Sequence, residues 1–287
     1  MAPGAAKGDL LYISSYANGE VLVYSYPQGK LVGTLTGFYG PDGICVDKRG
    51  DIWIVNNNAA GVVGVVEYKH GGTSPIATLV DPGYFPVNCS IDPTTGNLAL
   101  SNLETYYPYK QGNAAIYAHA QGMPKLYRDS KLFQVYFSGY DNKGDLYVDG
   151  TPSPSFGFQF AELPKGNKTF TNITLKGGTI YFPGKVLWDG KYVTVGDQTY
   201  QNKSPETSGI YQTTGSGGKI VGTTPLKGSS DVVGFWIQGN TVIAPDIGLL
   251  DVRFYRYPAG GKSTKVLPHC EGTPGCDAYG AAVSLAK

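Results

Sequence analysis

The stretch GICVDKRGDIWIVN, residues 43–56, decides the fold of this chain. It holds an apolar run that ends at Asp47, a polar turn that closes with Gly50, and a second apolar run over residues 52–55. Two short runs rich in β-branched and aromatic residues on either side of a Gly-containing turn are typical of a β-hairpin. Because variants of this pattern recur through the chain, we expect the hairpin to be part of a repeating unit.

Five complete copies of the unit can be aligned along the sequence. The residue that ends the first run is, in order, Asp47, Asp92, Asp141, Asp189 and Gln238, at spacings of 45 to 49 residues. Each copy is followed by two further short apolar runs, which gives four strands per repeat. Four strands at this period are typical of the blades of a β-propeller.

The sixth copy is split between the two ends of the chain. GDLLYISSY at residues 8–16 matches its second half, and AYGAAVSLAK at residues 278–287 matches its first half. A ring of blades must close, because an open ring leaves sheet edges unpaired. We therefore predict one all-β domain: a six-bladed β-propeller with four antiparallel strands per blade, closed by N- and C-terminal strands that share one blade. The predicted blades are 8–37 plus 278–287, 43–80, 87–128, 135–175, 182–224 and 231–268.

The composition excludes several classes of partner. Charged residues are 16% of the chain and the net charge is +1, so nothing in it favours nucleic acid or an acidic membrane surface. No apolar run reaches the length of about 18 residues needed to span a membrane. We expect a monomer.

The four cysteines fall into two pairs. Cys270 and Cys276 flank the turn-rich EGTPG, and we predict a disulfide between them. A disulfide favours an oxidising compartment, so we expect a secreted or periplasmic protein whose export signal preceded MAPGAAKGD. Cys45 and Cys89 occupy equivalent positions in successive repeats, and we expect them to be buried free thiols.

The unit PDGICVDKRGDIWIVN, residues 41–56, resembles the blade of the NHL-repeat propellers and of the senescence-marker-protein/gluconolactonase family. The phrase YPAGG at residues 257–261 is also similar to bacterial secreted propellers. The resemblance covers nearly the whole chain at the level of the blade pattern. It implies the architecture and does not identify a ligand.

Oxygen-bearing side chains end the second strand of every predicted blade. In a propeller these ends surround the mouth of the central channel, and oxygen ligands suit a hard cation such as Ca²⁺. The alternative is turn chemistry, since Asn, Asp and Ser commonly leave strands and open turns. The equivalent positions are Ser15 and the five candidate metal ligands Asn56, Asn102, Asp149, Asp197 and Asp246.

The resemblance to gluconolactonases implies a divalent metal held by a Glu of the first blade, Asn residues of middle blades and a later Asp. Asn102, Asp149 and Asp197 match the middle and late ligands, whereas Ser15 stands where the Glu is expected. A metal-dependent hydrolase of the lactonase type is therefore one alternative for the function. No Ser/His/Asp set can be assembled from the spacing, so catalytic residues are not identified.

The loops that enter the first strands are rich in aromatic residues, which bind sugars and other amphipathic ligands. The alternative is packing between blades or within loops. From these loops and from NLETYYPYKQGN at residues 102–113 we select Tyr39, Tyr84, Tyr106, Tyr107 and Tyr181 as candidate ligand contacts; the other entry-loop aromatics are Phe85, Tyr136, Phe182, Phe235, Trp236 and Tyr279. The leading prediction is an extracytoplasmic module that binds a small molecule, a glycan or a protein at the propeller mouth. Whether it is an enzyme is left open.

Overall fold

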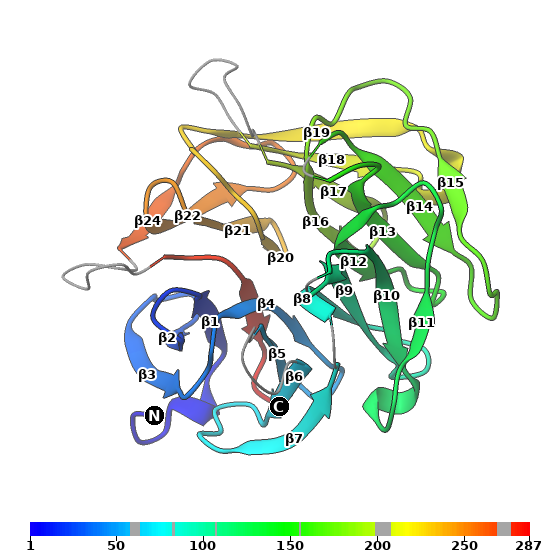
Figure 1. Ribbon diagram of the computed structural model, residues 1–287. Coiled ribbons are helices and arrows are strands. Elements are labelled where there is room, and N and C mark those ends of the chain that lie inside the picture. The colour runs from blue at the N-terminus through cyan, green and yellow to red at the C-terminus, as the bar shows by residue number, and fades with distance from the viewer. Residues whose placement is uncertain (58–63, 82–83, 107, 155, 199–207, 269–276) are drawn as a thin grey trace.

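The computed structural model describes residues 1–57, 64–81, 84–106, 108–154, 156–198, 208–268 and 277–287. Within these residues, six antiparallel sheets surround a central axis (Figure 1). Each sheet contains four consecutive positions of the repeat, from an inner strand beside the axis to an outer strand. The prediction of a six-bladed β-propeller is confirmed.

The first blade combines the two ends of the chain, as predicted. Its order is β25 (Ala281–Ser284), β1 (Leu10–Ser15), β2 (Glu20–Ser25) and β3 (Leu31–Thr36). Leu11 of β1 is paired with Val283 of β25 in an antiparallel register. The C-terminal segment therefore supplies the innermost strand of a blade whose other strands begin the chain, and Figure 1 shows it in red beside β4.

The next three blades follow the sequence order. Blade 2 contains β4 (Pro41–Val46), β5 (Ile52–Asn56), β6 (Gly64–Tyr68) and β7 (Pro75–Val80). Blade 3 contains β8 (Tyr84–Ile91), β9 (Leu98–Thr105), β10 (Gln111–Tyr117) and β11 (Lys125–Tyr127). Blade 4 contains β12 (Gln134–Tyr140), β13 (Leu146–Thr151), β14 (Gln159–Leu163) and β15 (Thr171–Ile173).

Blades 5 and 6 complete the ring. Blade 5 contains β16 (Pro183–Trp188), β17 (Val193–Asp197), β18 (Gly209–Thr213) and β19 (Ile220–Lys227), and the two-residue β23 (Gly261–Lys262) pairs with β19 in parallel. Blade 6 contains β20 (Trp236–Gln238), β21 (Thr241–Asp246), β22 (Asp251–Arg256) and β24 (Lys265–Pro268). Three short 3₁₀ turns, η1 (Ala5–Lys7), η2 (Ala118–Ala120) and η3 (Gly215–Gly217), lie outside the strands. No helix in the described part of the chain is long and apolar enough to cross a membrane.

The core lies between the blades. Apolar clusters join side chains from neighbouring sheets, such as Leu10 and Tyr12 of blade 1 with Ile44 and Ile54 of blade 2. These side chains are at most 1% exposed. Burial of this kind stabilises the ring by roughly 1.5–3 kcal/mol for each large apolar side chain.

The repeated Asp of the sequence pattern closes the turn between the first and second strands. Asp47 Oδ1 accepts hydrogen bonds from the backbone N–H groups of Arg49 at 2.7 Å and Asp51 at 2.9 Å. Asp141 makes the same bonds in blade 4, and Asp189 of blade 5 accepts in the same way from the N–H groups two and three residues on. Gly50 completes the first of these turns with a φ of 86°, a conformation that favours glycine. The residues that define the repeat are therefore turn residues.

One cysteine prediction is wrong. Cys45 of β4 and Cys89 of β8 are not free thiols but form a disulfide across 44 residues of sequence. The cause is the ring itself: equivalent positions of neighbouring inner strands lie side by side, with a Cα–Cα distance of 5.7 Å that suits a disulfide. The predicted Cys270–Cys276 bond lies outside the described residues.

Candidate functional site

A cavity of about 470 Å³ opens at the end of the channel where the inner strands begin, and we call it the mouth cavity. All six blades contribute to it, through the loops that enter their first strands, the first residues of those strands, and the ends of the second strands with the loops that follow them. Its aromatic walls are Tyr16, Phe85, Tyr136, Phe137, Phe182 and Tyr279; its carboxylates are Asp42 and Asp231; the remaining side chains are Val87, Leu103, Gln198, Val233 and Ile247.

The aromatic rings form two contacting pairs on different blades. The ring centroids of Tyr136 and Phe182 are 5.3 Å apart in an edge-to-face arrangement, and those of Tyr16 and Tyr279 are 5.5 Å apart. Both distances lie within the range favourable for aromatic pairs, so the rings hold one another in place. The cavity therefore has fixed, flat apolar walls.

Two carboxyl groups line the same cavity. Asp42 of β4 is only 8% exposed, and burial, with the neighbouring Asp277 carboxyl, raises its pKa to about 8 against the lowering effect of Lys185. Burial and the nearby Asp246 raise the pKa of Asp231 to about 6. The buried Oδ1 atom of Asp231 has no hydrogen-bond partner within the described structure.

Lys185 lies deeper in the channel. It is 3% exposed on β16, and its Nζ donates a hydrogen bond of 3.1 Å to the backbone oxygen of Ile44 in β4. Burial lowers the pKa of Lys185 to about 8, although Asp42 opposes that shift. Lys185 also lines a smaller cavity of about 200 Å³ at the opposite end of the inner strands, where the Cys45–Cys89 disulfide lies, and we call it the lower cavity.

Most of the predicted metal ligands accept hydrogen bonds from the loop that enters their own blade. Asn56 Oδ1 accepts from Tyr39 N at 2.8 Å, and Asp197 Oδ1 accepts from the N–H groups of Tyr181 at 3.2 Å and Phe182 at 3.0 Å. These bonds hold the entry loop against the end of the second strand. The arrangement is the turn chemistry that the sequence left open as the alternative to a cation.

Asp149 and Asp246 also accept hydrogen bonds from backbone N–H groups, those of Asp149 coming from inner strands and not from an entry loop. Asp149 accepts from Phe137 N at 3.0 Å and from Gly184 N of the next blade at 3.2 Å, and burial raises its pKa well above the usual value. Asp246 accepts from four backbone N–H groups, those of Ser230, Asp231, Gly248 and Leu249. No cluster of carboxylate oxygens among the described residues includes Asp149, Asp197 or Asp246.

Asn102 differs from the other four. Its Nδ2 donates to Asp81 Oδ2 at 2.8 Å and to Asn113 Oδ1 at 3.1 Å, and its Oδ1 has no partner within the described structure. Burial raises the pKa of Asp81 to about 6, which the Asn102 bond partly offsets. A Ca²⁺ site at these positions remains a prediction.

The four predicted ligand-contacting tyrosines that the structure describes, Tyr39, Tyr84, Tyr106 and Tyr181, are not among the described residues that line the mouth cavity. Tyr39 and Tyr181 project from the rim and are 67% and 54% exposed. Tyr84 packs beneath the guanidinium of Arg128, and the Tyr106 hydroxyl donates to Asn57 Oδ1 at 3.0 Å. Tyr107 lies outside the described residues.

The cavity is lined instead by the sequence neighbours of two of these tyrosines. Phe85 follows Tyr84 in β8, where successive side chains point in opposite directions, and Phe182 follows Tyr181 in the bend that precedes β16. The aromatic content of the entry loops indicated aromatic side chains around the mouth, but alternation alone does not separate rim from wall, because the adjacent residues Tyr136 and Phe137 both line the cavity. Asp42 and Asp231 were missed, and no residue pattern marked them.

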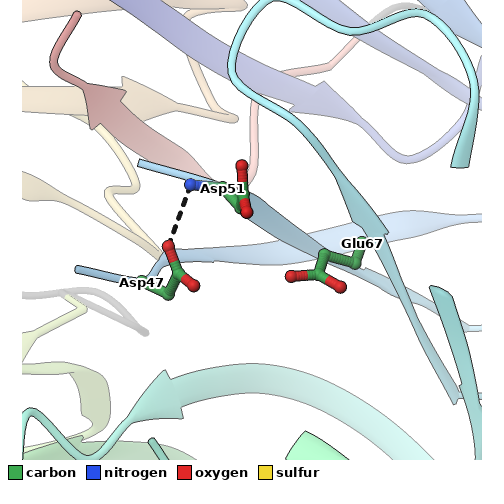
Figure 2. A group of neighbouring side chains, drawn as sticks. All are labelled: Asp47, Asp51 and Glu67. Atoms are coloured by element: carbon green, nitrogen blue, oxygen red, sulfur yellow. Dashed lines mark hydrogen bonds between the residues drawn. The ribbon is translucent and has the colours of Figure 1, made fainter. Parts of the chain in front are cut away.

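A group of three acidic residues lies at the other face of the ring, in blade 2. Figure 2 shows Asp47, Asp51 and Glu67 together, with the backbone N–H of Asp51 donating to Asp47. Arg49 bonds all three: its Nε lies 2.7 Å from Asp47 and 3.2 Å from Asp51, and its Nη2 lies 2.7 Å from Glu67. A guanidinium thus occupies the position that a metal ion would need, and the group is an ion-pair network.

Comparisons with known proteins extend the description of the fold. No known protein family matches the sequence, and no curated protein is similar to it. Among solved structures, the chain is similar to one in the crystal structure of a nidogen/laminin complex, with a TM-score of 0.74 and 11% sequence identity over 98% of this chain and 100% of that one. At this identity the similarity shows the six-bladed propeller architecture alone. The resemblance to NHL-repeat and gluconolactonase propellers is not confirmed by these sequence comparisons.

Proposed function

We propose that this protein is an extracytoplasmic binding protein that holds a small amphipathic ligand in the mouth cavity. The observation that carries the proposal is the cavity itself, which has a volume of about 470 Å³ and walls of aromatic side chains from several blades. Small-molecule sites are typically concave, mostly apolar and provided with a few polar groups that orient the ligand. Asp42, Asp231 and Gln198 supply such groups here.

The Cys45–Cys89 disulfide supports the extracytoplasmic location that we propose. Disulfides persist in oxidising environments and are rare in the cytosol of most cells. The bond lies between the inner strands of two blades, with Cys89 1% and Cys45 5% exposed. A structural disulfide of this kind fits a protein that works outside the cytoplasm.

A thermal-shift screen with soluble sugars, lactones, amines and aromatic acids tests the proposal, because a ligand that binds only the native state raises the melting temperature. We expect the shift to be lost in Phe182→Ala and Tyr136→Ala, which remove cavity walls. Tyr39→Ala is the matched control, since that ring is 67% exposed on the rim. A shift that survives both cavity variants, or a screen in which no compound binds, contradicts the proposal.

A second candidate function is protein binding at the rim of the mouth. Large apolar side chains from several loops of this face are exposed, between 41% and 67%; they are Tyr39, Tyr109, Phe156, Tyr181, Leu249 and Leu250. Exposed apolar side chains gathered on one face mark interaction surfaces. The rim variant Tyr39→Arg/Tyr181→Arg separates the two functions: it should abolish capture of a protein partner and leave the small-molecule thermal shift intact.

The lactonase alternative can be tested with an activity assay on the purified protein. It requires Asn102, Asp149 and Asp197 to share a divalent ion, whereas the described bonds engage these side chains with protein groups. Turnover of a lactone panel that depends on added Ca²⁺, Mn²⁺ or Zn²⁺ and is lost in Asn102→Ala would support it.

A further inference from the structure

We infer that the ligand of the mouth cavity is a small organic cation, an amine or quaternary ammonium compound whose charged group lies near Asp42 and Asp231. The inference rests on the proposed function and deepens it by naming the chemical class of the ligand.

The charge of the cavity lining has one sign. Two carboxyl groups, Asp42 and Asp231, line the cavity, and none of its described lining residues carries a positive charge. The Oδ1 atom of Asp231 is buried and has no hydrogen-bond partner within the described structure. A buried acceptor without a donor is costly, and an ammonium group in the cavity would supply the missing donor once the Asp231 carboxyl turns toward it.

The aromatic walls favour the same class of ligand. Tyr136 with Phe182 and Tyr16 with Tyr279 place ring pairs on different blades around the cavity. A cation placed over an aromatic face is attracted by the ring quadrupole, and the attraction grows when both groups are shielded from water. An anion would meet two carboxyl groups and several aromatic faces, so the lining selects against it.

Lys185 does not supply the missing cation. Its Nζ is bonded to the backbone oxygen of Ile44, and it lines the lower cavity and not the mouth cavity. The described ion pairs do not include one between Lys185 and Asp42. Asp42 accepts a hydrogen bond from the backbone N–H of Gly43 and is influenced by the Lys185 charge, but no described side-chain ion pair occupies its carboxyl group.

Binding should be coupled to proton release. Asp42 faces Asp277, Lys185, Tyr16 and Tyr279, and its pKa is raised to about 8 mainly by burial. Asp231 faces Asp246 and Tyr279, and its pKa is raised to about 6. A cation binds the ionised carboxylates more tightly than the neutral acids, so affinity should rise as the pH rises through both values.

Isothermal titration calorimetry at pH 8.5 with three matched probes tests the inference. The probes are phenethylamine, its neutral analogue 2-phenylethanol and the anion 3-phenylpropanoate. We expect the amine to bind at least about tenfold more tightly than the alcohol and the anion not to bind. Asp231→Asn should weaken amine binding at least about tenfold without lowering the melting temperature, because the Asp231 Oδ1 lacks a protein partner.

Asp189→Asn is the matched control, since Asp189 lines a different cavity of about 520 Å³ between blades 5 and 6. It should leave amine binding unchanged. A second experiment repeats the titration at pH 5.5, where the affinity for the amine should fall. A third uses Asp42→Asn, which should remove the part of the pH dependence of amine affinity near pH 8.

Each outcome bears on one claim. Binding of the alcohol or the anion as tightly as the amine, lost in Phe182→Ala, overturns the cation preference and leaves the mouth cavity as the ligand site. Amine binding that is indifferent to Asp231→Asn and Asp42→Asn also overturns the inference. Absence of amine binding overturns the inference as well. The thermal-shift screen then decides separately whether the mouth cavity binds another class of small molecule.

Discussion

Lys185 and Ile44 belong to opposite blades, yet the Nζ of Lys185 donates a hydrogen bond of 3.1 Å to the backbone oxygen of Ile44. The side chain therefore crosses the central channel from β16 to β4. On one side lies the mouth cavity with Asp42, and on the other lies the lower cavity with the Cys45–Cys89 disulfide. A buried ammonium and a buried carboxyl close to it make the stability of the ring depend on pH.

Asp42→Asn should become more stable relative to the wild type as the pH rises from about 4 to about 8. The folded-state pKa of Asp42 is about 8, above its usual value of 3.8, so its contribution to stability is fully present below pH 3.8 and is lost as the pH rises through 8. Within that window the change approaches about 1.4 kcal/mol per pH unit. Urea unfolding of both proteins at intervals from pH 4 to 8.5 measures the difference, and a difference that does not vary with pH contradicts the assignment.

The disulfide should carry a large share of the stability. Cys45 and Cys89 are separated by 44 residues, and closing a loop of that length restricts the unfolded chain by about 4 kcal/mol in the loop-entropy model. We expect Cys45→Ala/Cys89→Ala to lower the free energy of unfolding by about that amount.

Peptide mapping without reductant supplies the control for this variant. It should find Cys45 and Cys89 in one cross-linked species in the wild type. If both thiols are alkylated in unfolded, unreduced protein purified under oxidising conditions, the bond is absent. A double variant as stable as the wild type would equally rule out its contribution.

The sequence predicts the ring well because the ring follows from local signals. Each Asp-turn-strand unit, such as that of Asp47 and Gly50, forms within one blade, and the split repeat at residues 8–16 and 278–287 leaves only one way to close. The Cys45–Cys89 bond was missed although the repeat pattern placed the two cysteines at equivalent positions of successive blades, because the distance between neighbouring inner strands is set by the closed ring and not by local sequence.

The lining of the candidate site could be anticipated only in part. The entry loops are visible in the sequence as aromatic clusters, but the choice between Tyr181 on the rim and Phe182 in the cavity depends on how each loop is held. The Asp197 carboxylate holds this loop through the N–H groups of both residues. The channel carboxyl Asp42 lies on β4 and its neighbour Lys185 lies on β16. Lys185 and its bonded partner Ile44 of β4 are 141 positions apart in the sequence, so only the closed ring brings these strands together.

Asp246 should stabilise blade 6 through its hydrogen bonds. Its carboxylate accepts from the N–H groups of Ser230, Asp231, Gly248 and Leu249. Asp246→Ala leaves these donors without a partner in a largely buried site and should cost about 2–4 kcal/mol. Asp246→Asn is the matched control, because its Oδ1 can keep the three bonds that Asp246 Oδ1 accepts, and it should cost about 1 kcal/mol. Equal effects of the two variants in urea unfolding would contradict this role.

The closure of the ring by β25 gives the last prediction. Val283 is 2% exposed, is paired with Leu11 of β1 and packs in an apolar cluster with side chains of blade 6. Val283→Ala should lower the free energy of unfolding by about 2 kcal/mol because it opens a gap between the first and last blades. Leu285→Ala is the control: this side chain lies just beyond the strand and is 45% exposed, so its loss should change stability by less than about 0.5 kcal/mol.

Deletion of residues 281–287 removes the whole inner strand and should prevent cooperative folding, since it exposes the edge of β1 and uncovers the core on both sides. A truncated chain that melts at the temperature of the intact protein would show that the ring does not close through this strand.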